Sequence, residues 1–501
     1  MTPLPQSFAC PSPATALFAD LSRFAKLTRV SSQRGQTRYY DSFDWRLYQK
    51  GICCELTQTK TAAWLTLSQY MDGQTLARAD LTPPDNTAPL FTEHCPASLR
   101  PLLEPILSMR ALLNIGQIAC QCHQTTVIDT EDKVLVRLVL EEYQDGLSRL
   151  WVAPLKGYEK AARQFVGLLT NQLHLLPYHA GLLPERLTCQ PGSYTGKLDL
   201  ALNPAMRADT ACKDIYRQLH GIISANEQGI IHRTDSEFLH DFRVAVRKTR
   251  AGISQLNRVL PKRISRHYAG FFAELGRATS PVRDMDVYLL DFDGYKNALP
   301  LAIRADLEPL RTFLLTQQAH WQQELATTLA STAYTHTLTD WAQFLQQPTP
   351  QALQATHPDA HRPIKQVADQ RIGKLYHRAL REGKTIRRDS PADNFHTLRK
   401  TCKKLRYLME FFQTLYPTPL FKDLLKKLKN LQAILGTIQD CQVQADYIRQ
   451  FQAEPFPAPT QLALTALLQL LAERDEQARA AFTDTFAEFT HCDQRQLLAK
   501  H

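Results

Sequence analysis

The sequence contains no apolar run of about 18 residues, so it predicts no membrane-spanning helix. Its first 24 residues lack the basic stretch and apolar core of a secretion signal. It has no glycine-rich loop ending in Lys-Ser/Thr to hold a nucleotide. The 11 cysteines form neither a disulfide framework nor a pair of Cys-x-x-Cys motifs. We therefore expect a cytoplasmic protein that has no cofactor and no metal site.

The basic residues are concentrated in one part of the chain. The 501 residues carry a formal net charge of +10. Residues 362–429 hold 18 Lys and Arg against 6 Asp and Glu, which more than accounts for the whole excess. A cluster of one sign raises the local concentration of anions, whereas an ordinary solvated surface mixes both signs. The charge distribution therefore indicates an anionic ligand.

Hydrophobic periodicity divides the chain into two different halves. Strand-like runs occur at residues 52–57, 63–69, 117–128 and 134–143, and a helical pattern follows at 158–175. From about residue 206 the helical period dominates, with a proline-rich interruption at 348–363. We predict an α+β, barrel-like domain over residues 1–180, a linker over 181–204 and an all-α domain over 205–495. Its two helical bundles would span about 205–345 and 362–495.

One sequence pattern occurs twice in the helical half. Residues 238–250, FLHDFRVAVRKTR, and residues 394–406, NFHTLRKTCKKLR, share it at an offset of 156 positions. The same offset relates two later motifs, Ser280–Asp284 and Gly436–Asp440, without an insertion. The sequence therefore predicts an internal duplication.

The charged residues of each copy share one helix face. Positions 0, 3, 7 and 10 of the pattern fall within about 80° of one another on a helix, while Leu398, Cys402, Leu405 and Met409 lie near the opposite side. The candidate binding residues on and beside these two stripes are His240, Arg243, Arg247, Lys248 and Arg250, then His396, Arg399, Lys400, Lys403, Lys404 and Arg406, with Lys427 on the next helix.

The stripes are unusual because few acidic residues stand near them in the sequence. Like charges at i and i+4 destabilise a helix by a few tenths of a kcal/mol per pair, so a stripe of one sign needs a counter-charge. Arginine forms bidentate hydrogen bonds with phosphate oxygens and lysine adds a point charge. We therefore expect a phosphate-rich ligand, and the alternative is an ordinary solvated helix face.

The two copies resemble the CHAD domain, the conserved-histidine α-helical domain. The resemblance rests on His-x-x-Arg-x-x-x-Arg/Lys-Lys-x-Arg in both halves and on the two later motifs, and it spans roughly residues 205–490. It implies two pseudo-symmetric four-helix bundles, a basic cavity between them that binds inorganic polyphosphate through the residues named above, and an association with polyphosphate granules. Ser280 stands for the family's usual glycine and Gln439 for its usual arginine. We interpret Asp284 and Asp440 as partners of cations.

The N-terminal region more distantly resembles the CYTH triphosphate tunnel domain. The resemblance rests on Tyr39–Ser42, Leu47, Gly51 and Trp64–Leu67. The catalytic chemistry of that family is largely missing, because the initial Glu-x-Glu-x-Lys motif is absent from residues 1–38. We therefore predict no catalytic residue and an inactive, triphosphatase-like domain whose protein partner the sequence does not identify.

Three positions carry residues that do not suit a triphosphate tunnel. Glu55 and Thr57 occupy the places of paired arginines, and Ser68 stands for a lysine. Glu141 and Glu142 are interpreted as the remnant of an acidic strand, with the register left open by one residue.

Two other functions remain as alternatives. A metal-dependent inorganic triphosphatase of the tunnel type would use the N-terminal domain as an enzyme. A nucleic-acid backbone binder would use the basic helices, although the stripes lack interleaved aromatic residues for stacking on bases.

Overall fold

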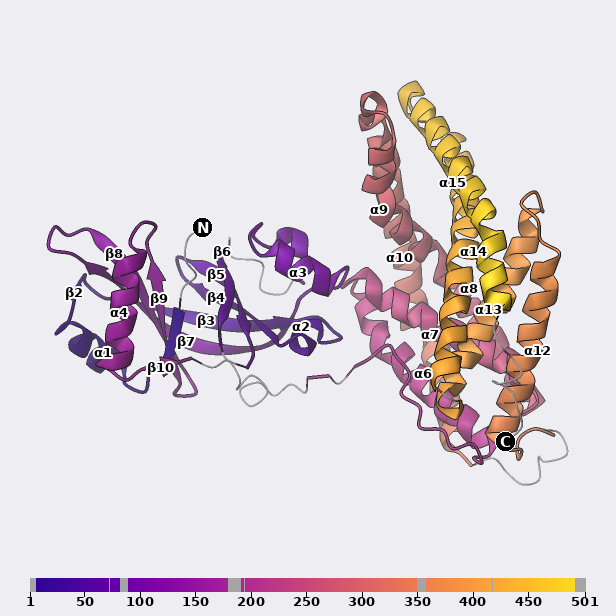
Figure 1. The fold of residues 1–501 in the computed structure, drawn as a ribbon, viewed down its shortest axis with the longest axis horizontal. Coiled ribbons are helices and arrows are strands. Elements are labelled where there is room, and N and C mark those ends of the chain that lie inside the picture. The colour runs from indigo at the N-terminus through magenta and orange to yellow at the C-terminus, as the bar shows by residue number, and fades with distance from the viewer. Residues whose placement is uncertain are drawn as a thin grey trace. The chain divides into compact units, whose positions relative to one another are not determined.

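The computed structural model describes residues 6–71, 73–81, 89–178, 191–192, 194–348, 357–416 and 418–491. The chain forms two compact units, Met1–Thr195 and Gly196–His501 (Figure 1). Parts of the predicted linker at 181–190 and 193, of the proline-rich interruption at 349–356, and of the predicted C-terminal end at 492–495 lie outside the described residues. No helix among the described residues is long and apolar enough to cross a membrane.

The first unit is built on one antiparallel sheet that curls into a half-barrel, in the strand order β10-β1-β9-β8-β7-β3-β4-β5-β6, with β2 paired to β7. Strands β5 and β8 have the predicted bounds, and β4 and β7 extend the predicted ones. The strands are β1 (Gln6–Ala9), β2 (Lys26–Leu27), β3 (Ser31–Asp41), β4 (Ile52–Thr59), β5 (Ala63–Gln69), β6 (Thr75–Asp80), β7 (Leu113–Ile128), β8 (Val134–Tyr143), β9 (Ser148–Pro154) and β10 (Leu176–Pro177).

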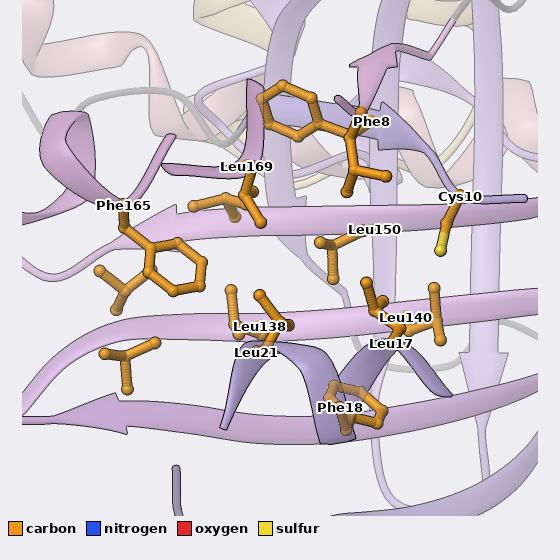
Figure 2. Packing of buried hydrophobic residues seen from close by; sticks show 14 of the residues in the cluster. Phe8, Cys10, Leu17, Phe18, Leu21, Leu138, Leu140, Leu150, Phe165 and Leu169 are labelled. Carbon is orange, nitrogen blue, oxygen red and sulfur yellow. The ribbon is translucent and has the colours of Figure 1, made fainter. Parts of the chain in front are cut away.

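Helices cover one face of this sheet. The helices of the unit are α1 (Ala14–Leu21), α2 (Arg46–Gln49), α3 (Arg100–Leu107) and α4 (Glu159–Asn171). Leucines and phenylalanines of α1 and α4 meet β8 and β9 in one cluster, in which Leu138, Leu140 and Leu150 are fully buried (Figure 2). Burying one such side chain stabilises the fold by about 1.5–3 kcal/mol. The predicted alternation along β8 therefore places Val136, Leu138 and Leu140 in this core.

The second unit is all helical, as the sequence predicts, and its helices follow the repeat. The helices are α6 (Ala208–Ile231), α7 (Ser236–Gln255), α8 (Lys262–Ala278), α9 (Ser280–Ala298), α10 (Glu308–Ala330), α11 (Thr332–Gln346), α12 (Ile364–Lys384), α13 (Ala392–Phe412), α14 (Thr418–Gln452) and α15 (Ala458–Thr490). Helices α6 and α7 begin 156 positions before α12 and α13. The pair α8 and α9 matches the single helix α14, and α10 lies within the range that matches α15.

A proline explains why α14 is one helix and its counterpart is two. Pro281 lies in the first turn of α9, where it lacks an N–H to continue the hydrogen-bond ladder of α8. The matching residue of the second repeat is Thr437, and α14 runs through it without a break. Each repeat therefore forms a four-helix bundle. In the first repeat the kinked pair α8–α9 takes the place of one of the four helices, and α11 is an additional helix.

The two repeats start at a common point. The residues before α6 and α12 pair as an antiparallel bridge between Arg207 and Pro363. The Ala208 N–H donates to the Arg362 carbonyl at 2.9 Å, and the Ile364 N–H donates to the Met206 carbonyl at 2.8 Å. The 156-residue offset that relates the repeats also turns each of these two bonds into the other. They therefore mark a local pseudo-two-fold axis.

The repeats also share a hydrophobic core. One buried cluster joins α9 and α10 of the first repeat to α14 and α15 of the second, which run beside each other in Figure 1. Its larger side chains include Tyr288, Phe292 and Tyr295 from α9 with Ile448 and Phe451 from α14. The Tyr447 hydroxyl of α14 also donates to Asp284 of α9 at 3.1 Å. The second unit is therefore one body and not two separate bundles.

Close packing at Gly229 offers a test of how α6 fixes the start of α7. A Cβ at Gly229 would lie 2.1 Å from the Phe238 ring, whereas a Cβ at Gly221 on the same helix would meet nothing within 4 Å. Gly229→Ala should lower the free energy of unfolding by about 1–3 kcal/mol, because it overpacks a filled site. Gly221→Ala should raise it by up to about 1 kcal/mol through helix propensity. Denaturant unfolding followed by circular dichroism measures both, and equal effects of the two substitutions would contradict this packing.

Candidate functional site

Helix α7 carries the first stripe, and Asp235 fixes where it begins. The Asp235 carboxylate accepts hydrogen bonds from the backbone N–H groups of Glu237 at 3.0 Å and Phe238 at 3.3 Å, which is a helix N-cap. The buried face of the helix includes Phe238, Leu239, Phe242, Ala245 and Val246. Burial of this face leaves His240, Arg243 and Arg247 on the partly exposed side.

Helix α13 carries the second stripe and orients it in the same way. Leu398, Cys402, Leu405 and Met409 are all fully buried, which confirms the predicted core face of this helix. On its other side Arg399 and Lys403 are partly exposed, and Lys400 is exposed.

The two stripe helices pack against each other. Gly252 of α7 allows the approach, since a Cβ there would lie 3.3 Å from the Phe411 ring of α13 and 2.8 Å from the Tyr216 ring of α6. The Lys248 ammonium of α7 pairs with the Glu410 carboxylate of α13 at 2.9 Å. Packing therefore brings the two copies of the sequence pattern together from positions 156 residues apart.

Positive charge is crowded where the helices meet. Burial and the neighbouring charges of Arg399 and Arg247 lower the pKa of Lys403 to about 7, although Asp440 opposes the shift. Burial, followed by the charge of Arg247, lowers the pKa of Arg243 to about 10. Since Arg247 belongs to the first copy and Lys403 to the second, the cations of both repeats share one electrostatic environment.

Three arginines of this group have buried donors without an acceptor. The Nε atoms of Arg243, Arg247 and Arg399 are buried, and none has a hydrogen-bond partner among the described residues. A buried donor left without a partner costs free energy, and few native groups remain so. These donors can be satisfied by an anion whose oxygens reach between the helices.

Carboxylates of the chain neutralise four of the candidate cations. The expectation that the stripes find no counter-charge within the chain is therefore wrong for these four. The pairs are Lys248 with Glu410 at 2.9 Å, Arg406 with Glu410 at 3.3 Å, Arg399 with Asp440 at 3.4 Å and Lys427 with Asp423 at 2.8 Å. Among the residues that the structure describes, Arg243, Arg247, Arg250, Lys400, Lys403 and Lys404 have no ion-pair partner.

The two histidines of the pattern have different neighbours. His396 hydrogen-bonds through Nδ1 with the Gln439 side-chain oxygen. His240 instead stands near Arg283, and burial together with that charge lowers the pKa of His240. Arg283 and Gln439 are related by the repeat offset, so the histidine has a hydrogen-bond partner in the second repeat and a neighbouring charge in the first. Arg283 was not among the candidate binding residues. The repeat offset could have found it, because it relates Arg283 to Gln439 in the later motif.

The later motifs orient the stripe arginines. Arg243 donates to the hydroxyl oxygens of Thr279 at 2.7 Å and Ser280 at 3.2 Å. In the second repeat Gly436 stands opposite, and Arg399 passes 3.7 Å from the position that a Cβ would take there. Ser280, which replaces the glycine usual in the resembling family, thus holds Arg243 in place. Asp440 pairs with Arg399 as interpreted from the sequence, and Asp284 accepts from Tyr447 beside Arg243.

The first unit has a different charged cluster on the sheet face away from its helices. The Arg149 guanidinium lies 2.6 Å from a carboxylate oxygen of Glu55 and 3.1 Å from one of Glu141, and all three side chains are buried. Burial alone would raise the pKa of Glu141, but the charges of Arg149 and Arg78 lower it. Arg149 also lies over the Trp151 ring, 4.4 Å from its centroid.

This cluster settles the register left open by the sequence. Glu141 faces the cluster, whereas Glu142 accepts from the Ala14 N–H at 2.7 Å beneath α1 and contacts His123 at 2.8 Å. Thr57 and Ser68 are buried as well. Among the described residues no group of three or more His, Cys, Asp or Glu side chains is placed to hold a metal ion.

Several solved structures are similar to parts of this chain. The CHAD domain from the plant Ricinus communis matches with a TM-score of 0.50 and 22% identity, over 59% of this chain and 95% of that chain. PptA from Streptomyces chartreusis matches with a TM-score of 0.42 and 17% identity, over 56% of this chain and all of that one. HpAC1 from Hippeastrum, a protein with a dominant triphosphatase activity, matches with a TM-score of 0.27 and 13% identity, over 38% of this chain and 99% of that one.

Comparison with family models identifies the helical half. No curated protein sequence matches this chain. The family model described as the CHAD domain matches residues 215–449, a range that includes α7, α13 and both later motifs. Residues 215–449 thus carry a CHAD domain, which confirms the resemblance recognised in the two sequence copies.

Proposed function

We propose that α7 and α13 together bind inorganic polyphosphate. The observation that carries the proposal is the set of buried Nε donors on Arg243, Arg247 and Arg399, which have no hydrogen-bond partner among the described residues. Beside them, burial and the neighbouring positive charges lower the pKa of Lys403 to about 7. Each phosphate unit of a polyphosphate chain supplies a negative charge, and its oxygens accept charge-assisted hydrogen bonds from guanidinium groups. A ligand of this chemistry relieves both the unpartnered donors and the repulsion.

The distribution of unpaired cations favours an extended ligand. Arg243, Arg247 and Arg250 follow α7 at intervals of about one turn, and Lys400, Lys403 and Lys404 add charge from α13. A chain of phosphates can contact such a series, whereas a single phosphate would neutralise only part of it. Carboxylates already pair with three other residues of the proposed site, so these should contribute less to binding: Lys248, Arg406 and Lys427. Binding of this kind would direct the protein to polyphosphate granules.

We propose that the first unit does not hydrolyse triphosphate. Its Arg149 is held between Glu55 and Glu141, so this cation is already neutralised. Tunnel-type hydrolysis requires carboxylates that hold a divalent metal and cations that hold the triphosphate. The unit then serves as a scaffold or as a surface for a protein partner.

Removing two unpaired cations tests the main proposal. Arg247→Gln combined with Lys403→Gln should weaken the binding of long-chain polyphosphate at least about tenfold. Each charge-assisted hydrogen bond is worth about 1.5–3 kcal/mol, and 1.4 kcal/mol corresponds to a factor of ten. Calorimetric titration near physiological salt measures the change. Arg217→Gln on α6 is the control, since Arg217 is half-exposed and already paired with Asp214. Absence of binding by the native protein, or equal loss in the control, would reject the proposal.

The lowered pKa of Lys403 predicts proton uptake on binding. In the free protein Lys403 is mostly neutral above its pKa of about 7, and an adjacent phosphate favours the charged form. At pH 8.5 binding should therefore take up roughly one proton, and affinity should fall as the pH rises from 7. Titrations in buffers of different ionisation enthalpy measure the uptake, which Lys403→Gln should remove. Identical uptake in the variant would contradict the assignment.

The same shift predicts how the stability of the free protein changes with pH. Between pH 7 and the ordinary lysine pKa of 10.5 the folded state binds fewer protons than the unfolded state, so Lys403 makes the free energy of unfolding rise with pH. Lys403→Gln should flatten this rise in denaturant unfolding.

The two alternative functions have direct tests. Incubation of the protein with inorganic triphosphate and magnesium or manganese should release no phosphate, and metal-dependent release would instead establish the triphosphatase. Duplex DNA should compete poorly with polyphosphate for the protein, because the stripes offer no aromatic residues for bases. Equal competition by DNA at the same phosphate concentration would favour the nucleic-acid alternative.

A further inference from the structure

A basic pocket lies where the C-terminal end of α7 meets the start of α8. Its volume is about 430 Å³, and its lining includes Asn257, Arg258, Lys262, Ser265 and Arg266. A second hollow of about 550 Å³ adjoins it through Lys262 and Arg266 and adds Arg263 and His267. Among the described residues Lys262, Arg263 and Arg266 have no ion-pair partner.

The N-terminus of α8 opens on this pocket. The helix has 17 residues, and the preceding Pro261 provides no side-chain cap for its first N–H groups. Free N–H groups and the helix dipole make such a terminus favourable for anions. The first two residues of the helix are cations, which would normally be unfavourable at a helix start. Lys262 and Arg263 therefore suit an anion that lies against them.

A buried hydroxyl in the pocket lacks a hydrogen-bond partner. Ser265 is only 8% exposed and lines the pocket, and its Oγ has no partner among the described residues. A buried hydroxyl in this state gains a hydrogen bond when an acceptor enters. Arg258 is less available, because it pairs with Asp359 at 3.2 Å, and Asp359 is also close to Arg362 and Arg371. The nearby carboxylate is thus already neutralised by arginines.

The second repeat lacks the buried hydroxyl of this pocket, although Lys422 stands at the position that matches Arg266. The offset relates Ser265 to Phe421, which is buried and stacks on Tyr416 with ring centroids 4.7 Å apart. It also relates Arg263 to Pro419. In the second repeat an apolar ring therefore occupies the position that a polar, unpartnered hydroxyl has in the first.

The pocket lies on the continuation of the α7 stripe. Counting about 100° per residue from His240, Ser254 near the end of α7 falls at roughly 320°, between Arg250 and Arg247. Asn257 follows just after the end of the helix. Both Ser254 and Asn257 line the pocket. A chain of phosphates that follows α7 toward its C-terminus would arrive at the start of α8.

We propose that this pocket is a second anion site, which binds a terminal or free phosphate group through Ser265, Arg266 and the first turn of α8. The phosphate comes either from a separate small oligophosphate or from the end of a chain held along α7. The second source rests on the proposed function, and the first is independent of it.

The experiment uses the full chain, inorganic triphosphate as the probe, and calorimetric titration at low ionic strength. To isolate the pocket, the background is the variant Arg247→Gln/Lys403→Gln. This background should still bind triphosphate. Adding Arg266→Glu should weaken that binding at least tenfold, and adding Ser265→Phe should do the same by filling the pocket as Phe421 does. Adding Lys160→Glu, which changes the charge equally at an exposed position of α4, should change it less than twofold.

The results separate this inference from the proposed function. The pocket proposal is overturned if the background variant does not bind triphosphate, or if neither Arg266→Glu nor Ser265→Phe changes this binding. Neither outcome bears on the binding of long-chain polyphosphate. Loss of triphosphate binding in Arg266→Glu while the native protein fails to bind long chains supports the pocket and rejects the proposed function.

Long-chain polyphosphate then identifies the source of the phosphate. Arg266→Glu in the otherwise native chain should weaken long-chain binding severalfold if the chain end enters the pocket. An unchanged long-chain affinity with lost triphosphate binding assigns the pocket to separate small phosphates. Arg266 is exposed, so this variant tests the pocket even if Ser265→Phe disturbs folding.

Discussion

The contact between α7 and α13 is the constraint on which the helical unit depends. It sets two cationic faces side by side, where burial together with the neighbouring charges of Arg399 and Arg247 lowers the pKa of Lys403. Such a contact needs compensation from other parts of the fold. The buried aromatic cluster shared by α9, α10, α14 and α15 supplies it at one end of the repeats. The antiparallel bridge at Arg207 and Pro363 joins them at a second place.

Carboxylates divide the cations into two groups with different roles. Glu410 is close to both Lys248 and Arg406, so one acidic residue ties α7 to α13 and reduces the local charge. Arg243 and Arg247 have no such partner in the described parts of the chain. Glu410 thus lowers the charge at the interface between the helices, while the α7 stripe stays positive at Arg243 and Arg247. This arrangement suits a site that must be stable when empty and still attract an anion.

Much of this organisation could be predicted from the sequence, because duplication and helical periodicity are local signals. The offset of 156 residues correctly relates α6 and α7 to α12 and α13, and the apolar period correctly buries Leu398 and Cys402. The pairing of Lys248 with Glu410 could not be found in this way, because it depends on how two distant helices pack. The burial of Glu141 against Arg149 was also missed: alternation gives the face of a strand but not what covers that face. The Ser265 pocket likewise arises only where the end of one helix meets the start of another.

The exchanged backbone bonds before α6 and α12 have the geometry of an isologous contact, as found between the subunits of a homodimer. In a homodimer every substitution appears on both sides of the axis at once. Here a single polypeptide carries both halves, so each can change alone, and Arg283 opposite Gln439 and Ser265 opposite Phe421 are two such changes. Fusion of the halves therefore permits a surface with unlike ends on a framework whose two repeats meet at a local pseudo-two-fold axis.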